Sequence, residues 1–332
     1  MNPEFLRRFR RNKGAVAGVF VLALIAVAAL AAPWLAAHDP WAMVQRPFLQ
    51  PFAERGLLLG SDALGRDVAA GLVYGARVSL IIGLVATAAA LVAGITVGAL
   101  AGYHGGWVDA LLMRFTELFQ AIPGFAFAVV LVAIFQPSVY SIVAAIALVS
   151  WPPVARLVRS EFLSLRQREF VQAALLAGQS SAKIIFTQIL PNAVSPIVVM
   201  GSLMVASSIL LESALSFLGL GDPSMMSWGY MVGAARTALR QAWWIAVFPG
   251  LAIAATVLAL NLVGEGLSDG LNTRLDVRTR CAPARSRCST SRVFRSVCPP
   301  ARTGRWRSKA SISRSLQARP SASLAKAAQA SR

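Results

Sequence analysis

The stretch REFVQAALLAGQSSAKIIFTQILPNAVSP, residues 168–196, decides how this chain is organised, because it places a polar, helix-patterned interval between two long apolar stretches. Its apolar residues recur at helical spacing, and Gly178 lies near its middle. Flanking stretches of about 20 apolar residues are long enough to cross a membrane as helices. The interval therefore marks a segment that stays outside the membrane between two crossings.

The pattern of the interval predicts a pair of short helices with a tight turn. Residues 160–177 read as one helix, and Gly178 suits a helix-ending position with a positive φ angle. A second helix is expected to begin at Ser180 or Ser181 as its cap and to be limited by Pro191. Two interpretations of the apolar face stay open: it packs on the protein's own helices, or it docks on a soluble partner.

The composition is that of a membrane protein, since 56% of the 332 residues are hydrophobic and only 14% are charged. We predict an all-α fold with six transmembrane helices. The third should bend at AIPGF, residues 121–125, and Arg114 and Glu117 lie near its start. The first is interpreted as a retained anchor, because more spans follow it. The expected spans are 14–35, 78–102, 111–135, 138–155, 193–211 and 243–263.

Basic residues in short loops predict the orientation of the chain. Residues 1–13 carry five Lys or Arg side chains, so the N-terminus is expected in the cytoplasm, and six crossings return the C-terminus there. Residues 36–77 then form an extracytoplasmic loop, and residues 160–192 form a cytoplasmic loop within a transmembrane core at 78–270.

The net charge of +18 belongs mostly to a tail. Residues 277–332 hold 14 of the 32 basic residues and no acidic residue, which leaves a net charge of +4 for residues 1–276. The tail lacks helical or strand periodicity and is predicted to be disordered. It is either a basic tail that touches anionic lipid or a product of out-of-frame translation, and we favour the second. A membrane-anchored nucleic-acid binder is a further alternative that rests on this tail alone, and we expect no nucleic-acid partner.

Energy-converting and catalytic chemistry is missing from the sequence. No G-x-x-x-x-G-K-[ST] phosphate-binding loop occurs, and the interiors of five of the six expected spans hold no ionisable side chain. The only histidines are His38 and His104, and Cys281, Cys288 and Cys298 lack the spacing of a zinc site. We therefore expect no catalytic residue and no metal in this chain. If the chain transports a solute, its energy should come from another protein, and a stand-alone channel or ion-coupled carrier is the alternative.

The segment QAALLAGQSSAKIIFTQILPN, residues 172–192, resembles the EAA loop of binding-protein-dependent ABC transporter permeases. Three further segments are similar to the second-permease subunit of peptide and nickel import systems: LGSDALGRDVAAGLVYGARVSLIIG at 59–83, ESALSFLGLGDPSMMSWGYMV at 212–232, and WWIAVFPGLAIAATVLALNLVGEGLSDGLNTRL at 243–275. The resemblance covers about residues 5–275. It implies the type I fold of ABC importers and a multi-pass protein of the bacterial inner membrane.

The resemblance also implies partners and site residues. ATP and Mg would be bound by two separate ATP-binding subunits, this chain would form half of a pore with a homologous permease, and an extracytoplasmic binding protein would deliver the solute. The implied coupling residues are Gln172, Ala173, Ala174, Gly178, Ile189, Leu190, Pro191 and Asn192. Motif positions without an assigned role are Gly60, Asp62, Gly65, Arg66, Asp67, Gly75, Arg77, Glu212, Trp228 and Gly229.

The chain departs from the family pattern at Gln172, where the first position of E-A-A is usually glutamate. Glutamine keeps the hydrogen-bonding capacity but loses the charge. Smaller departures occur in GEGLSDG at 264–270 and NTR at 272–274. Peptides are the expected solutes, with nickel chelates, glutathione and opine-like conjugates as alternatives.

Overall fold

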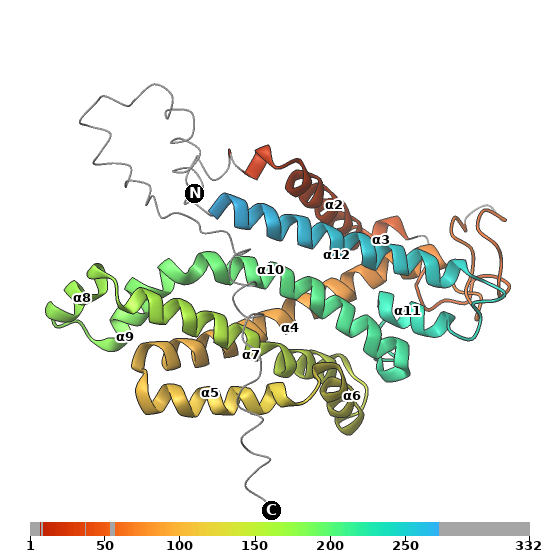
Figure 1. Cartoon of the computed structure of the whole chain (residues 1–332). Helices are drawn as coiled ribbons and strands as arrows, with labels where there is room; N and C mark the ends of the chain where they lie inside the picture. Colours follow the sequence, from red (N-terminus) through yellow and green to blue (C-terminus); the bar gives the residue numbers. More distant parts are fainter. Residues whose placement is uncertain (1–6, 8, 37, 54–56, 272–332) are drawn as a thin grey trace, which may run out of the picture. The chain divides into compact units, whose positions relative to one another are not determined.

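The structure, a computed structural model, describes residues 7, 9–36, 38–53 and 57–271, so the predicted tail at 277–332 lies outside the described residues. Within the described part, most helices are joined by short connections, the described residues between 36 and 67 form a longer stretch of turns, and no β-strand forms (Figure 1). Two isolated β-bridges pair Met43 with Arg66 and Ser61 with Asp67. The predicted all-α class is confirmed for these residues.

Among the residues that the structure describes, five helical segments are long and apolar enough to cross a membrane: Lys13–Leu30, Val68–His104, Val139–Arg166, Ser181–Leu220 and Trp244–Leu271. The fourth segment, Ser181–Leu220, contains two π-helical turns, η1 (Ile184–Ile189) and η2 (Ser216–Leu220), one on each side of its longest α-helix. The α-helices are α2 (Lys13–Leu30), α3 (Ala32–Leu35), α4 (Val68–His104), α5 (Gly106–Ala121), α6 (Gly124–Phe135), α7 (Val139–Arg166), α8 (Glu169–Leu176), α9 (Ser181–Lys183), α10 (Leu190–Leu215), α11 (Trp228–Ala235) and α12 (Trp244–Leu271).

The third expected span is divided into α5 and α6, which meet at an angle of 82°. The break lies at Ile122, whose backbone is extended, and at Pro123, which caps α6. Proline disfavours a helical residue before it and removes one backbone donor, so the helix ends there. The bend predicted at 121–125 is confirmed, and six spans result only if the bent pair counts as one.

Two helices extend well beyond the apolar stretches that predicted them. Helix α4 begins at Val68, ten residues before the expected span, because the side chain of Asp67 accepts the backbone N–H of Ala69 at 2.8 Å and caps it. Helix α7 continues without a break from its apolar part to Arg166. The prediction of a single helix over 160–177 is therefore wrong, because a turn at 167–168 separates α7 from α8.

The centre of the bundle is a seam of small residues between α4 and α7. Gly94, Gly98 and Gly102 recur every four residues on one side of α4. A Cβ atom on Gly98 would lie 2.5 Å from the carbonyl oxygen of Ala155, and one on Gly102 would lie 2.6 Å from the Cβ of Phe162. The two backbones therefore touch, as small residues permit in membrane helices, and α4 and α7 form one packed pair.

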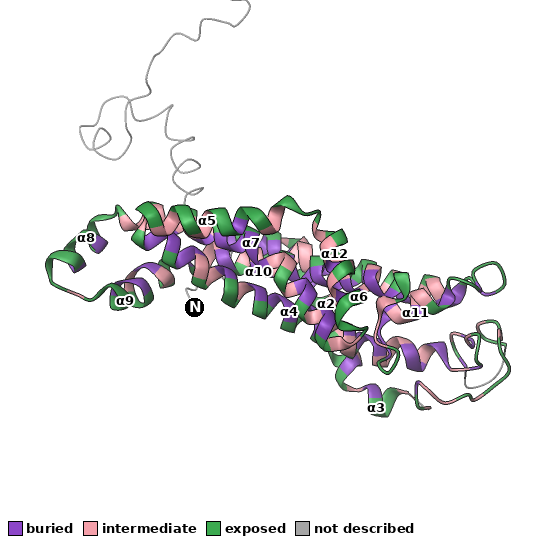
Figure 2. Cartoon of the chain, turned by 90° about the horizontal axis from the view of Figure 1, so that it is seen from below, coloured by how far each residue is buried: buried purple, intermediate pink, exposed green. Residues whose placement is uncertain are grey.

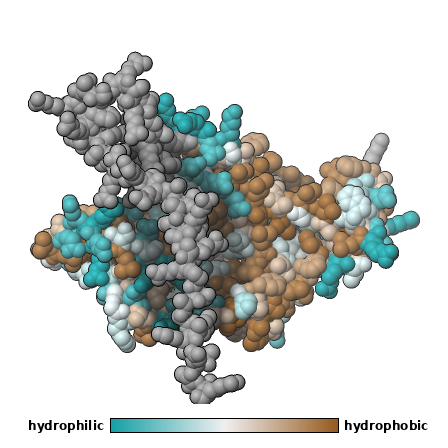
Figure 3. All heavy atoms as spheres, in the orientation of Figure 1, coloured by the Kyte–Doolittle hydropathy of each residue, from teal (hydrophilic) through white to brown (hydrophobic). Residues whose placement is uncertain are grey.

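The two ends of the bundle differ from its middle. Helices α8 and α9 lie at one end, here the α8 end, and α3, α11 and the turns between residues 38 and 67 lie at the other, here the α11 end (Figure 1). Along the bundle between the ends, buried residues face inward and exposed residues cover the outside (Figure 2). Figure 3 shows hydrophobic residues gathered over the middle and hydrophilic residues toward the ends, as a bilayer requires.

Candidate functional site

Helix α8 packs one side against the protein's own core. Val171 and Ala174 are buried in a cluster that includes Phe162 of α7 and Ile184 and Ile189 of η1. Val171 and Ala174 are three residues apart in α8, which is the spacing of one helix face. The interpretation that the segment packs on the protein's own helices is therefore confirmed for this side of α8.

The opposite side of the same segment exposes large apolar side chains. Leu176 at the end of α8 is 90% exposed, and Phe186 in η1 is 66% exposed. Phe170, Leu175 and Ala173 are exposed as well. An apolar patch of this kind at a solvent-facing end is a candidate docking surface, so the two interpretations of the segment apply to its two sides.

Helix α8 ends in a Schellman motif, which fixes the elbow of the loop. The N–H of Gly178 donates to the carbonyl of Leu175 at 3.0 Å, and the N–H of Gln179 donates to that of Ala174 at 3.2 Å. Gly178 has a φ of +68°, and a Cβ atom on it would meet nothing within 4 Å. Glycine is therefore favoured by the backbone angle and not by a lack of space inside this chain.

The second half of the loop does not end at Pro191. Helix α9 passes into η1, and α10 follows with Pro191 in its first turn, so the predicted helix limit is wrong. A proline is tolerated in the first turn, and the wider π turn before it interrupts the regular hydrogen-bond pattern. Ile189 is buried, Leu190 is half-buried, and Asn192 is exposed and donates from Nδ2 to the carbonyl of Gln188 at 2.6 Å.

Gln172 ties α8 back to α7. Its Nε2 donates to the carbonyl of Arg166, the last residue of α7, at 3.1 Å. The last carbonyls of a helix lack partners within the helix, so this bond satisfies one of them. An ionised glutamate at this position could only accept hydrogen bonds. The departure from the family pattern therefore creates a contact that glutamate cannot make.

A second group of motif residues meets at the α11 end, around Glu212 of α10. Glu212 is 1% exposed, and its Oε1 accepts the hydroxyls of Ser216 at 2.9 Å and Ser227 at 2.8 Å. Ser227 caps α11 by accepting the N–H of Tyr230 at 3.0 Å. One buried carboxylate thus joins α10, η2 and the start of α11.

Trp228 and Gly75 extend this group to α4, and Gly229 packs closely against α10. The indole N–H of Trp228 donates to the carbonyl of Leu72 at 2.8 Å. A Cβ atom on Gly75 would lie 3.0 Å from Cδ1 of Trp228, and one on Gly229 would lie 2.7 Å from Cα of Ser213. These glycines are needed because backbones approach closely there. Arg77, also on α4, is exposed and takes no part in the group.

The motif at 60–67 builds the turns that lead into α4. Asp62 Oδ1 accepts the N–H groups of Leu64 and Arg66, both at 2.8 Å. Gly60 and Gly65 have φ angles of +81° and +76°, which favour glycine. The guanidinium of Arg66 lies 4.6 Å from the ring centroid of Trp41. With Asp67 as the cap of α4, these residues have structural roles.

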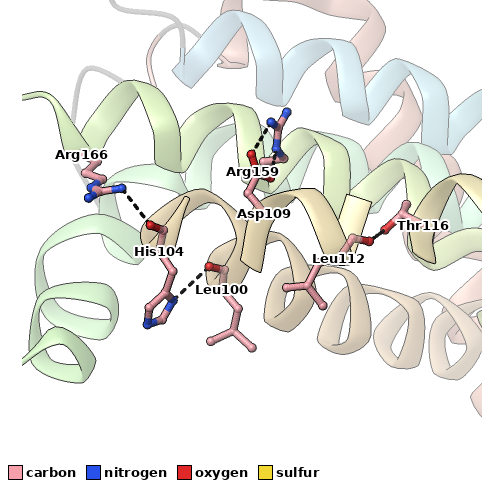
Figure 4. A network of polar contacts seen from close by, with 7 residues as sticks. All are labelled: Leu100, His104, Asp109, Leu112, Thr116, Arg159 and Arg166. Carbon is pink, nitrogen blue, oxygen red and sulfur yellow. Dashed lines mark hydrogen bonds and ion pairs between the residues drawn. The ribbon is translucent and has the colours of Figure 1, made fainter. Parts of the chain in front are cut away.

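Two contacts made by arginine side chains of α7, one of them an ion pair, were not predicted (Figure 4). Arg159 of α7 donates from Nε and Nη2 to the two carboxylate oxygens of Asp109 in α5, with Nη2 2.6 Å from Oδ2. Arg166 Nη1 donates to the carbonyl of His104 at 3.4 Å. Finding these contacts from sequence would require knowing that α5 and the end of α4 lie beside α7, and no local pattern states that.

Asp222, in the turn after η2, contacts the start of α7. Its Oδ2 accepts the N–H of Val139 at 3.0 Å, and its Oδ1 accepts the N–H and hydroxyl of Ser224 at 2.8 and 2.6 Å. Burial opposes ionisation, but these hydrogen bonds outweigh it and hold the pKa of Asp222 below its usual value. The carboxylate therefore links α7 to the turn before α11.

The described residues offer no metal centre, since no group of three or more His, Cys, Asp or Glu side chains among them could hold an ion. The two groups of motif residues lie instead at the opposite ends of α10. The coupling residues implied by the resemblance lie at the α8 end, and Glu212, Trp228 and Gly229 lie at the α11 end. A displacement of α10 would therefore reach both groups.

Comparison with protein families gives two matches. Residues 94–277 match the family described as "Binding-protein-dependent transport system inner membrane component". Residues 4–51 match the "N-terminal TM domain of oligopeptide transport permease C".

Curated relatives match over most of their length. A di/tripeptide transport system permease protein DppC of Pseudomonas aeruginosa is 41% identical over 278 residues, which cover 82% of this chain and 92% of that protein. A glutathione transport system permease protein GsiD of Pectobacterium atrosepticum is 41% identical over 82% of this chain and 91% of its own length. An oligopeptide transport system permease protein OppC of Haemophilus influenzae is 36% identical over 273 residues, which cover 81% of this chain and 87% of that protein.

A solved structure of the MetNI methionine ABC transporter in an inward-facing conformation contains a chain of similar fold. Its TM-score is 0.52 at 15% identity, and the match covers 61% of this chain and 96% of that chain. At this identity the similarity supports the fold alone. The arrangement of helices described above is therefore one that has been observed in an ABC transporter.

Proposed function

Because the chain belongs to the family of binding-protein-dependent transport system inner membrane components, we propose that it forms one half of the pore of an ATP-driven importer of short peptides. The chain is a permease subunit and not an enzyme, and it lies in the inner membrane, as this family does. The observation that carries the finer proposal is the exposed apolar side of the loop at 168–192, on a chain without a phosphate-binding loop.

The loop has the features of a coupling element. Its inner side is fixed by Val171 and Ala174, its elbow is fixed by the motif around Gly178, and its outer side presents Leu176 and Phe186. An apolar helical surface of this kind fits a groove on a soluble partner. We infer that two ATP-binding subunits, which carry ATP and Mg, dock here and in the matching loop of a second permease.

Movement of the loop would then reach the rest of the chain through rigid elements. Helix α10 continues from η1 to Glu212, and α7 meets α8 at the hydrogen bond from Gln172 to Arg166. Closure of two ATP-binding subunits would swing such helices as bodies and alternate access to the pore. The loop would lie in the cytoplasm, and the α11 end would receive a solute-binding protein on the opposite side.

Peptides are the solutes that the relatives favour. Two of the relatives above are named for di/tripeptide and oligopeptide transport. The glutathione permease is equally similar at 41% identity, so glutathione, itself a modified tripeptide, is the second candidate. Both candidates share charged termini or side-chain carboxylates, which a pore must accommodate.

Reconstitution tests this proposal directly. Liposomes containing the chain, a second permease of the same family and two ATP-binding subunits should take up a labelled tripeptide only with ATP and the binding protein present. Uptake by this chain alone, driven by an ion gradient, would instead identify a stand-alone carrier. Full uptake after deletion of residues 160–188 would also contradict the proposal.

A further inference from the structure

A basic segment leads directly into the first crossing helix. Five of the seven residues from 7 to 13 are basic, and no acidic residue lies among them. Residues 14–37, which follow, carry no charged side chain. The positive charge is therefore concentrated at the start of α2.

Two contacts hold one side of this segment against α12. A Cβ atom on Gly266 of α12 would lie 3.0 Å from Cε2 of Phe9, so the aromatic ring packs on that helix. Asn12 caps α2 with its side-chain oxygen, and its Nδ2 donates to Oδ2 of Asp269 on α12 at 3.1 Å. Phe9 and Asn12 therefore fix the side of the segment that faces the protein.

The arginines occupy another face of the segment. Residues 7 and 9–11 have a helical backbone, and Arg7, Arg10 and Arg11 are three and four residues apart, which places them on one face. These three side chains and that of Lys13 are exposed. None of the four forms an ion pair with another described residue. Four cations are thus presented outward without a counter-ion from the described part of the chain.

The length of α2 fixes the level of the segment in the membrane. The helix has 18 residues, which span about 27 Å by the rise of an α-helix, close to the hydrocarbon thickness of about 30 Å. Phe20 in the apolar part of α2 is 70% exposed, as a lipid-facing side chain would be, and Trp34 beyond the far end of the helix is 88% exposed. Tryptophan is typical of the membrane interface. The residues before Gly14 therefore lie at the level of the lipid headgroups.

The segment lies on the same side of the membrane as the loop at 168–192. Helix α12 begins at the α11 end, where the indole N–H of Trp244 donates to the carbonyl of Ser61 at 3.2 Å. It is long and apolar enough to cross the membrane before it reaches Gly266, on which Phe9 packs. The proposed function places this side in the cytoplasm, and only the choice of leaflet rests on it. The cytoplasmic leaflet carries a negative surface potential that attracts basic segments beside a crossing helix.

We propose that residues 7–13 form a site for anionic phospholipids, whose phosphates contact the arginines and hold the start of α2 against α12. A guanidinium matches the oxygens of a phosphate with two hydrogen bonds. The acidic residues in the last turns of α12, Glu265 and Asp269, form no ion pair with the arginines, so the arginines stay available. A zwitterionic lipid would bring its own cation to this basic face, so the site prefers a lipid with a net negative charge.

The lipid composition beside α2 tests the site. In a background where the three cysteines are serine, Val16→Cys carries a fluorophore in the first turn of α2, where the native side chain is 45% exposed. The full chain is placed in nanodiscs of phosphatidylcholine that contain a minor share of brominated phosphatidylglycerol or, separately, of brominated phosphatidylcholine. Quenching by the anionic lipid should be stronger about threefold or more. In Arg10→Gln/Arg11→Gln the two lipids should quench nearly equally, and an unchanged preference would overturn the proposal.

Two control variants separate the site from general effects of charge. Arg46→Gln/Arg240→Gln removes two exposed arginines at the α11 end and should keep the preference. Arg10→Lys/Arg11→Lys retains both charges and should keep most of it. Loss of the preference in either control would contradict the site. The basic tail is present in every variant, so a preference that belongs to the tail would survive in Arg10→Gln/Arg11→Gln and overturn the proposal. No measurement here requires transport, so the outcome is independent of whether the chain imports peptides.

Discussion

The guanidinium of Arg159 on α7 holds the carboxylate of Asp109 in the first turn of α5 by two hydrogen bonds. The side chains of Arg159 and Asp109 are only 34% and 16% exposed, and the planar guanidinium matches the carboxylate in a two-pronged contact. Arg159 lies in the last turns of α7, the helix that leads into α8. The pair therefore joins α5 to the helix that leads into the loop at 168–192.

Reversing one charge of this pair should uncouple the transporter. Arg159→Asp and Asp109→Arg each place two like charges together, so peptide uptake per ATP hydrolysed should fall by about tenfold, and the double reversal should recover most of it. The measurement is uptake and hydrolysis in the same proteoliposomes. Asp269→Ala, which removes the exposed contact with Asn12, is the control and should change little. Equal losses in the single and double variants would show that the pair has no coupling role.

Restoring the family's usual residue at Gln172 should loosen the joint between α7 and α8. In Gln172→Glu the carboxylate cannot donate to the carbonyl of Arg166, so one helix-end carbonyl loses its partner. Hydrogen exchange of the α8 amides in the isolated chain should become several-fold faster, and Gln172→Met should have the same effect. Unchanged exchange in both variants would show that the bond does not hold α8.

Two glycine-to-alanine substitutions should differ for geometric reasons. Gly229→Ala puts a methyl group 2.7 Å from Cα of Ser213 and 2.8 Å from Oε1 of Glu212, which should destabilise the fold by about 1–3 kcal/mol. Gly178→Ala meets no atom within 4 Å, so it should cost only the strain of a positive φ, about 1 kcal/mol. Gly178→Asn should cost less, because asparagine tolerates this angle. Thermal unfolding in detergent measures the stability of the three variants, and we expect Gly229→Ala to be the least stable and Gly178→Asn the most stable.

The contact of Asp222 with Val139 should weaken in acid. Because the pKa of Asp222 is lower in the folded state, its stabilising contribution is full above the unfolded value, about 3.9, and is lost as the pH falls through the folded value. The difference in stability between the protein and Asp222→Asn should thus be constant at neutral pH and shrink below about pH 4. A difference that grows on acidification would contradict this sign.

The sequence predicted the fold class and the crossing helices well, because apolar length and hydrophobic composition determine them directly. It also predicted the bend near Pro123 and the elbow at Gly178, where local backbone chemistry dominates. It placed the start of α4 too late, since Asp67 caps a helix whose first turns are not fully apolar. It ended the second loop helix at Pro191, because the π turn of η1 has no simple sequence pattern.

The candidate site was predictable only where a motif was present. The resemblance supplied the loop residues and Glu212, but it assigned Glu212 no role, and its serine partners come from segments up to 15 residues away. The Asp109–Arg159 pair spans 50 residues, and the hydrogen bond between Asn12 and Asp269 spans 257 residues. Such relationships arise from tertiary packing, which one sequence does not display.

The central claim is that the exposed side of the loop at 168–192 transmits the work of ATP hydrolysis, and Leu176→Asp tests it most directly. Leu176 is 90% exposed, so the charge should leave the fold intact, as thermal unfolding can verify. Ser268→Asp, at an exposed position of α12, is the control. The measurement is ATP-dependent tripeptide uptake by the reconstituted transporter. We predict that Leu176→Asp lowers uptake about tenfold or more while Ser268→Asp retains it; full uptake by a correctly folded Leu176→Asp transporter would contradict the account.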